Sequence, residues 1–268
     1  MKTSILLAMA FSLLLASNAY AGWIIESNTT MQDGEKSKEV VYIQDNKMKV
    51  VSWEGQSIGQ IMIFDIEKGT MCVCMPERKV YFCSTPDELK KSSEEMANKM
   101  KEAMMAKMPP EQREAYKKMM EMEAGEKEAA PEKKATYKVK KTLEKASIAG
   151  FSTVKHQVFM NGELDQELWL ASKVKAVDEL DMGKMINMMK GMSDSGEHVS
   201  FSSTQECLEL MRQGFPIKTV HYEEGEQSQV EEAVRIEKKK IPASELKPPE
   251  GYKELTMEEV YGMMRGGH

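Results

Sequence analysis

Two blocks of short strand-like runs, each run bounded by a turn signal, constrain the fold of this chain most strongly. In the first block the runs lie at 23–31, 39–43, 47–53, 57–66, 70–75 and 80–83. Turn signals such as Gln44-Asp45-Asn46 and Glu67-Lys68-Gly69 separate them. Because short turns between consecutive runs favour hairpins, the block is predicted to form an antiparallel meander.

The second block repeats this pattern and adds helices. Its strand-like runs lie at 135–143, 153–160, 163–171, 217–223 and 229–239. The dipeptide Asn161-Gly162, between two of these runs, is among the strongest hairpin signals. Apolar residues at helical spacing predict a helix that begins at Asp181, and a capping box predicts another that begins at Ser203. A short helix or a tail is expected at 256–268.

A methionine-rich helical insertion, at about 86–134, separates the two blocks. Thr85-Pro86-Asp87-Glu88 is a capping-box start for a helix. Methionines then recur every four residues, at Met96, Met100, Met104 and Met108. Pro109-Pro110 ends this helix, and a charged stretch at 125–134 is predicted to be a linker. The two blocks and the insertion are expected to form one domain over 22–255.

Residues 1–21 have the pattern of a signal peptide for export. Lys2 precedes a compact apolar run, and Ala19-Tyr20-Ala21 has the small-x-small pattern of a signal-peptidase site. The run is too short for a membrane-spanning helix. Cleavage after Ala21 would leave Gly22 first, and because Gly22 is not cysteine, no bacterial lipid anchor is expected. The mature chain is predicted to be periplasmic or secreted.

The charge pattern argues against several classes of partner. The net charge is −6, and lysines are interleaved with glutamates rather than gathered into a basic patch. Such a chain is not expected to bind nucleic acid or anionic lipid headgroups. No later apolar run approaches the length of a membrane span, so the protein is not expected to span a membrane.

The cysteines are disulfide candidates if the chain is exported to an oxidising compartment. They are Cys72, Cys74, Cys83 and Cys207. Pairing Met75 with Val80 across the intervening turn places Cys72 opposite Cys83, and this register predicts a disulfide between the two. Cys74 shares their face, because side chains two apart on a strand point the same way. Its partner, if it has one, would be Cys207.

No catalytic signature stands out in the sequence. It contains no Gly-x-Ser-x-Gly elbow, His-Glu-x-x-His pair, phosphate-binding glycine loop or haem-attachment motif. His156 and His221 fall in alternating strand-like runs, where an ordinary strand histidine is the simpler interpretation. We therefore assign no catalytic residue and expect neither a cofactor nor an enzymatic activity.

The 25 methionines allow two interpretations. Their helical spacing favours packing of helices against the sheet, but pliable methionines can also line a groove for apolar ligands. The groove candidates are Met96, Met100, Met104, Met182, Met185 and Met189. Methionine and cysteine are also ligands that monovalent copper prefers, so a soft-metal site at Cys72, Cys74 and Cys83 is an alternative.

A series of short motifs, in fixed order, carries a resemblance to a known family. They include Trp23-Ile24-Ile25-Glu26-Ser27, Asn46-Lys47-Met48-Lys49-Val50, Ile63-Phe64-Asp65, Ile148-Ala149-Gly150-Phe151, Glu167-Leu168-Trp169, Gly214-Phe215-Pro216-Ile217, Ile241-Pro242-Ala243-Ser244 and Pro249-Glu250-Gly251-Tyr252. With them the chain resembles a secreted bacterial family known as domain of unknown function 4412. The resemblance spans nearly all of the mature chain except the insertion and the tail.

That family resembles the periplasmic lipoprotein carriers, and the resemblance implies a fold and a class of function. The implied fold is α+β: a curved antiparallel half-barrel sheet with helices on its concave face. The implied function is a non-enzymatic periplasmic binding protein that holds a lipid, a lipoprotein acyl chain or another apolar ligand. Two alternatives stay open: a copper-binding or envelope-stress protein, and a protein-interaction module of the cell envelope that uses the insertion as its contact surface.

Overall fold

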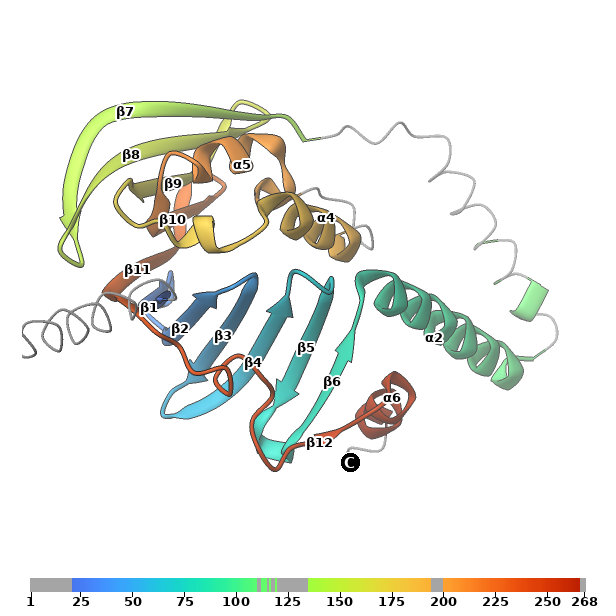
Figure 1. Ribbon diagram of the computed structural model, residues 1–268. Coiled ribbons are helices and arrows are strands. Elements are labelled where there is room, and N and C mark those ends of the chain that lie inside the picture. Colours follow the sequence, from blue (N-terminus) through green and yellow to red (C-terminus); the bar gives the residue numbers. More distant parts are fainter. Residues whose placement is uncertain are drawn as a thin grey trace, which may run out of the picture.

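The computed structural model describes residues 21–109, 112–114, 116, 119, 135–193 and 200–265. The signal-peptide prediction, apart from Ala21, and the whole of the predicted linker at 125–134 lie outside these residues. Both β blocks join one unclosed sheet of twelve strands, in the order β12-β6-β5-β4-β3-β2-β1-β11-β10-β9-β8-β7. The fold is α+β and matches the curved half-barrel that the sequence predicts (Figure 1).

The first block forms six consecutive antiparallel strands, as its turn signals predict. They are β1 (Gly22–Met31), β2 (Lys36–Gln44), β3 (Lys47–Glu54), β4 (Ser57–Asp65), β5 (Thr70–Met75) and β6 (Val80–Ser84). Asp45 and Asn46, in the turn between β2 and β3, have positive φ angles of 52° and 58°. Asparagine and aspartate tolerate this conformation well, which explains the position of the hairpin.

The second block supplies the remaining long strands, all antiparallel to their neighbours. They are β7 (Tyr137–Ile148), β8 (Phe151–Met160), β9 (Glu163–Ala171), β10 (Phe215–Glu223) and β11 (Glu226–Lys239). Asn161 and Gly162 form the predicted two-residue hairpin, with φ angles of 54° and 96°. A short strand, β12 (Lys253–Glu254), runs parallel to β6 at the other edge of the sheet.

One ladder joins the two blocks. β1 pairs with β2 on one side and with β11, more than two hundred residues away in the chain, on the other. Ile25 lies opposite Ile236, and the register shifts between Glu26 and Ser27, which leaves Val234 as the extra residue of a β-bulge. Bulges increase the local twist of a sheet, and this one lies where the two blocks meet.

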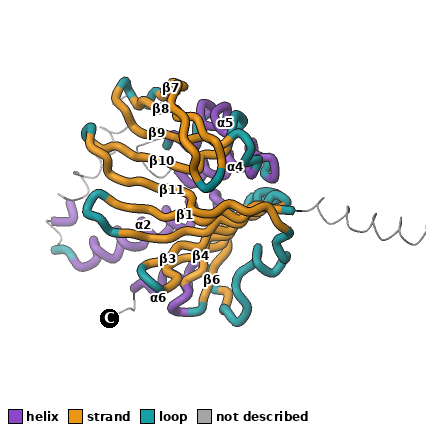
Figure 2. Tube along the Cα trace, turned by 90° about the vertical axis from the view of Figure 1, so that its left-hand side faces the viewer, coloured by secondary structure: helices purple, strands orange, loops and turns teal. Residues whose placement is uncertain are grey.

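Helices occupy the concave side of the sheet (Figure 2). They are the 3-10 helices η3 (Ala176–Glu179) and η4 (Phe201–Ser203), and the α-helices α4 (Met182–Ser193) and α5 (Gln205–Met211). Met188 of α4 packs with Val50 and Phe64 of the first block. Leu210 of α5 packs with Leu168 of the second block. The helices therefore contact both halves of the sheet and bury its inner face.

The N-terminus of α5 differs from the sequence prediction. The cap is Thr204 rather than Ser203, because the Thr204 side chain accepts a hydrogen bond from the Cys207 backbone N–H at 3.2 Å. Ser203 lies instead in η4, where its side chain is buried and donates to the Ser200 carbonyl. Both serine and threonine are strong N-cap residues, so the sequence alone placed the helix one residue too early.

The convex face over β2–β5 is covered by the segment that follows β11. The Ile241 backbone N–H donates to Gln44 Oε1 at 2.9 Å, and Lys49 forms an ion pair with Glu245 at 3.5 Å. Tyr252 packs near Cys74 in a cluster that also contains Ile61. The segment ends at α6 (Met257–Arg265), whose first turn is capped by reciprocal hydrogen bonds between Thr256 and Glu259. The last described residues of the chain therefore form a helix.

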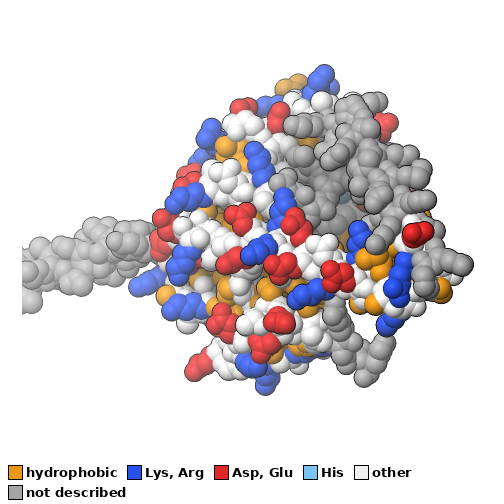
Figure 3. Space-filling model, turned by 90° about the vertical axis from the view of Figure 1, so that its right-hand side faces the viewer, with side chains coloured by type: hydrophobic (Ala, Val, Ile, Leu, Met, Phe, Trp, Pro, Cys, Tyr) orange, Lys and Arg blue, Asp and Glu red, His pale blue; other side chains and the backbone are white. Residues whose placement is uncertain are grey.

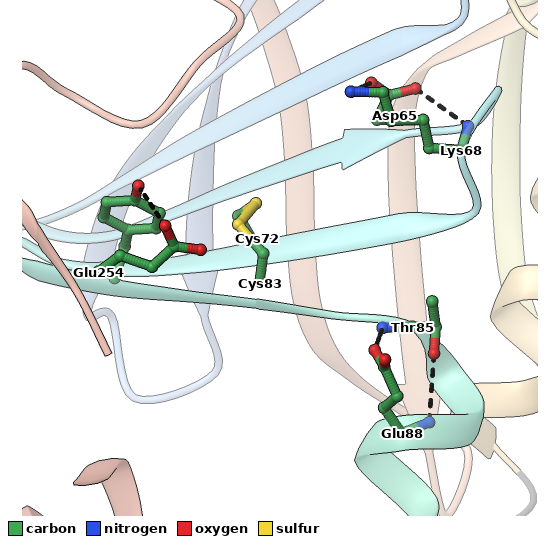
Figure 4. Close-up of a disulfide and its surroundings, with 8 residues drawn as sticks. Asp65, Lys68, Cys72, Cys83, Thr85, Glu88 and Glu254 are labelled. Carbon is green, nitrogen blue, oxygen red and sulfur yellow. Dashed lines mark hydrogen bonds and ion pairs between the residues drawn. A yellow bond between two sulfur atoms is a disulfide. The ribbon is translucent and has the colours of Figure 1, made fainter. Parts of the chain in front are cut away.

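Helix α2 (Pro86–Lys107) begins where the capping box predicts. The Glu88 backbone N–H donates to Thr85 Oγ1, and the Thr85 N–H donates to the Glu88 carboxylate (Figure 4). None of its residues is buried, and it extends away from the sheet (Figure 1). No helix among the described residues is both long enough and apolar enough to cross a membrane.

The predicted disulfide between Cys72 and Cys83 is confirmed (Figure 4). It links β5 to β6 at the register that places Met75 opposite Val80. Cys74 and Cys207 are free and buried, so the conditional second pairing is not formed. The reason is topological, because Cys74 lies in the cluster on the convex face and Cys207 lies in the cluster beneath α5.

The disulfide yields a prediction about thiol count and stability. The oxidised, denatured protein should show two reactive thiols with a thiol reagent, and four after reduction. Replacing both Cys72 and Cys83 with serine should lower the free energy of unfolding by about 2–3 kcal/mol, because the bridge closes a short loop. Urea unfolding measures this change. Four thiols in unreduced protein from an oxidising compartment would contradict the pairing.

Candidate functional site

A cavity of about 310 Å³ lies on the concave side, at the junction of the two blocks. Its floor is the inner face of β1, β2, β3, β10 and β11, and its roof comes from η3, α4 and the end of α5. The lining is mainly aliphatic and includes Ile25, Val41, Val50, Ile217 and Ala233. These residues alternate along their strands with residues that point to the convex face, as the period of a β-strand requires.

Asn46, in the turn between β2 and β3, anchors the loop that carries part of the roof. Asn46 Oδ1 accepts a hydrogen bond from the Asp181 backbone N–H at 2.6 Å, and the Asn46 N–H donates to the Glu179 carbonyl at 2.8 Å. These bonds fix the loop between η3 and α4, so that Leu180, Met182 and Met185 face the cavity. The turn residue thereby sets the distance between roof and floor.

A second cavity of about 480 Å³ lies beside the first, between β9, β10 and the helices η4 and α5. Leu168, Leu170, Phe201 and Cys207 contribute to its lining. Both cavities share three lining residues: Met211, Pro216 and Thr219. We call the two adjoining cavities the concave groove. Each volume falls in the range of small-molecule sites, about 300–1,000 Å³.

Two carboxylates interrupt the apolar floor of the first cavity. Glu39 on β2 and Glu231 on β11 both line it, on either side of β1. Glu39 accepts a hydrogen bond from the Ser52 hydroxyl at 3.2 Å, and Glu231 accepts one from the Ser27 hydroxyl at 3.1 Å. Within the described part of the chain, neither carboxylate forms an ion pair.

The environment of Glu39 favours its neutral form. Burial raises the pKa of its carboxyl above 4.5, the negative charge of Glu231 raises that pKa further, and the Ser52 hydrogen bond opposes the shift. A carboxylate held in apolar surroundings without a cation destabilises the folded state. We infer that Glu39 is retained at this position at a cost in stability.

The structure distributes the six groove candidates unequally. Met182 and Met185 line the first cavity, whereas Met189 is not among the residues that line either cavity. Met96, Met100 and Met104 lie on α2 and line neither cavity; Met100 and Met104 are 54% and 48% exposed. Their regular spacing indicates a continuous face, but this face does not cover the sheet.

Sequence reasoning missed the two glutamates, although a signal for them was present. Glu39 points to the same side of β2 as Val41 and Ile43. Glu231 points to the same side of β11 as Ala233, two residues further along the strand. An acidic residue on the apolar face of a strand is informative, because buried carboxylates are rare. Met211 was also missed, since the helix that carries it is short.

Two of the three candidate ligands of the soft-metal alternative are not free thiols. Cys72 and Cys83 are joined in the disulfide, and burial raises the pKa of the Cys74 thiol to about 11. A thiol with so high a pKa supplies little thiolate, the form that binds metals. Across the described residues, no group of three His, Cys, Asp or Glu side chains is placed to hold a metal ion.

His156 fits the interpretation of an ordinary strand histidine. Its side chain is buried, and its Nδ1 lies 3.2 Å from the Val154 carbonyl oxygen. Burial lowers its pKa, so the ring is held neutral in the folded protein. On the face that Figure 3 shows, positive and negative side chains of the described residues are interspersed rather than segregated by sign.

The fold defines a structural class, the α+β proteins built on a curved and unclosed antiparallel sheet. Within it, the chain belongs to the family described as domain of unknown function (DUF4412), whose sequence profile matches residues 87–252. The match begins at α2 and includes the insertion, so strands β1–β6 lie outside it, although the sequence motifs had suggested a resemblance from Trp23 onward. No curated protein is significantly similar in sequence.

Solved structures show only remote similarity. The chain aligns with PNGF-II at 12% identity and a TM-score of 0.39, covering 92% of this chain and 33% of that one. It aligns with MucB at 12% identity and a TM-score of 0.40, covering 89% and 60%. The MucA/MucB complex of Pseudomonas aeruginosa gives 10% identity and 0.40, covering 89% and 59%. The chain thus spans between a third and three fifths of their length.

Glu39 gives a prediction about stability and its pH dependence. Since the folded state raises the pKa of this carboxyl, folding binds a proton, and stability should fall as pH rises from about 4.5 through the raised pKa. Glu39→Gln should therefore raise the midpoint of thermal unfolding at neutral pH, and the gain should shrink in acid. Differential scanning calorimetry at several pH values measures both effects. Glu163→Gln, at an exposed position, is the control, and an equal gain there would contradict the assignment.

Proposed function

We propose that the protein is a non-enzymatic binding protein of the periplasm that holds an apolar ligand, such as a lipid or an acyl chain, in the concave groove. The observation that carries this proposal is the first cavity, whose lining is aliphatic and whose volume of about 310 Å³ suits a small ligand. A second cavity adjoins the first and shares lining residues with it, which favours a ligand with an extended apolar chain.

The energetics of apolar burial favour this ligand class. Each methylene group transferred from water to an apolar site contributes about 0.8 kcal/mol, so several buried methylenes suffice for micromolar binding. The roof residues Met182, Met185 and Met211 are unbranched and adaptable, which suits chains of differing length and shape. A disulfide fits the oxidising compartment that the proposal requires.

A bulky side chain in the first cavity should weaken the binding of apolar ligands. Ala233 is 4% exposed and lines the floor, so Ala233→Phe would place an aromatic ring where the ligand lies. Binding of a neutral apolar dye such as N-phenylnaphthylamine should weaken about tenfold or more, a loss of about 1.4 kcal/mol or greater. Fluorescence titration measures the affinity, and circular dichroism checks that the variant folds.

The adjacent residue provides a matched control. Val234 is the bulged residue, is 52% exposed and lines neither cavity. Val234→Phe adds the same ring on the same strand and should leave dye binding within about twofold of the wild type. No dye binding by the wild-type protein, or equal losses in the two variants, would contradict a ligand site in the concave groove.

A second candidate function is a protein-interaction module that uses α2. The observation that favours it is the surface of α2: none of its residues is buried, yet Met100 and Met104 are large, apolar and half-exposed on one face. Exposed apolar faces of this kind are typical of contact surfaces, and methionine suits partners of varied shape.

The two candidates can be separated on α2 itself. Replacing Met100 and Met104 with glutamine should change the free energy of unfolding by less than about 0.5 kcal/mol, because neither side chain is buried. If α2 is a contact surface, the same double variant should lose the crosslinks that a photoreactive residue at exposed Lys99 forms in the periplasm. Crosslinks that persist in the variant would contradict this role, whereas loss of dye binding would place α2 in the ligand site.

A further inference from the structure

The acidic floor of the first cavity differs from the acidic surface on the other side of the same strands. On the convex side, Glu26 has two cationic partners, Lys38 at 3.2 Å and Arg235 at 3.1 Å. On the concave side, Glu39 and Glu231 have hydroxyl partners and, among the described residues, no cationic partner. In the described part of the chain, cations therefore pair with the outward-facing carboxylate Glu26 but not with the two carboxylates that face the cavity.

Among the residues that the structure describes around the cavity, no cation pairs with Glu39 or Glu231. From η3 and α4 the cavity receives Val177, Leu180, Met182 and Met185, all of them apolar. Lys218 of β10 also lines the cavity, but its ammonium group is paired with Glu232 at 2.6 Å. Glu39 thus lies beside a second carboxylate in a mainly apolar lining, and a positive charge supplied from outside would stabilise its ionised form.

We propose that the concave groove selects amphiphiles whose apolar body ends in a protonated amine, and that Glu39 and Glu231 bind this amine. This inference rests on the proposed function and specifies its ligand class. The apolar part would lie against the aliphatic floor and the methionines of the roof, and would extend past Met211 toward the second cavity. The ammonium group, with three donors, would lie between two acceptors that Ser27 and Ser52 orient.

An organic amine fits this site better than a metal ion does. Calcium takes six to eight oxygen ligands, and magnesium requires near-octahedral oxygen coordination. Apart from Lys218, which is paired with Glu232, the polar residues of the cavity lining are Glu39, Glu231, Ser27 and Thr219, and the rest of the lining is mainly aliphatic. That combination matches a ligand with a large apolar surface and a single positive charge. The same charges disfavour fatty acids, because a ligand carboxylate would be repelled by both glutamates.

A comparison of three ligands with the same chain tests the selectivity. Dodecylamine, dodecanol and dodecanoate would each compete with N-phenylnaphthylamine, at concentrations below those at which micelles form. For the wild-type protein we expect dodecylamine to bind about tenfold more tightly than dodecanol, and dodecanoate to bind more weakly than dodecanol. The ratio of the amine affinity to the alcohol affinity is the quantity measured.

Charge-neutral variants assign this ratio to the two glutamates. In the double variant Glu39→Gln and Glu231→Gln, the ratio should fall from about ten to about one. The matched control replaces Glu26 and Glu237, on the convex side of β1 and β11, with glutamine. It changes the net charge by the same amount and should retain the ratio. The three-ligand comparison on the wild-type protein already decides the question if the double variant does not fold.

The outcomes separate this inference from the proposed function. If dodecanol binds but dodecylamine has no advantage, the amine site is wrong and the apolar groove stands. If none of the ligands displaces the dye and the dye itself does not bind, the proposed function fails and the inference with it. Displacement by a lysine-containing apolar peptide but not by dodecylamine would overturn the amphiphile in favour of a polypeptide ligand. Loss of the ratio in the convex-side control would overturn the assignment to Glu39 and Glu231.

Discussion

The antiparallel pairing of β1 with β11 is the interaction on which the rest of the structure depends. It joins residues more than two hundred positions apart and makes one sheet of two meanders. Neither meander alone fully buries its inner face, because the helices that cover this face pack against both meanders. Once the ladder forms, η3, α4 and α5 can pack against both halves at once, and the cavity exists only at their junction.

The bulge in this ladder has a second effect, on the polarity of the site. By shifting the register between Glu26 and Ser27, it turns Ala233 and Glu231 toward the cavity while Val234 points to solvent. An uninterrupted ladder would have reversed the faces on one side of the shift, since side chains alternate with a period of two. The carboxylate of Glu231 thus faces the cavity as a result of one inserted residue, which explains how an acidic residue came to lie on an apolar floor.

Local features of the sequence predicted most of the elements, because short turns and caps are encoded by neighbouring residues. The Asn161-Gly162 hairpin, the capping box at Thr85 and the Cys72–Cys83 pairing were all correct for this reason. The cavity was not predictable, since its floor combines β2 with β11 and its lining depends on the register across β1. Periodicity also misled the interpretation of Met100 and Met104, because a regular stripe shows that residues share a face but not what covers it.

In the proposed amine site, stability and ligand selection oppose each other at Glu39, and the neighbours of Glu39 offset part of the cost in stability. The surrounding strands supply many aliphatic contacts, and the Ser52 hydroxyl satisfies one carboxylate oxygen. A lysine at an adjacent inward position would stabilise the fold more, because it would pair with Glu39. Its side chain would, however, occupy the cavity and neutralise the carboxylate that the proposed ligand binds. A half-buried carboxylate without a cationic partner lowers the stability of the fold, and a large supporting core offsets this cost. A twelve-stranded sheet that buries its inner face under helices provides such a core, so the large sheet can tolerate the carboxylates in its cavity.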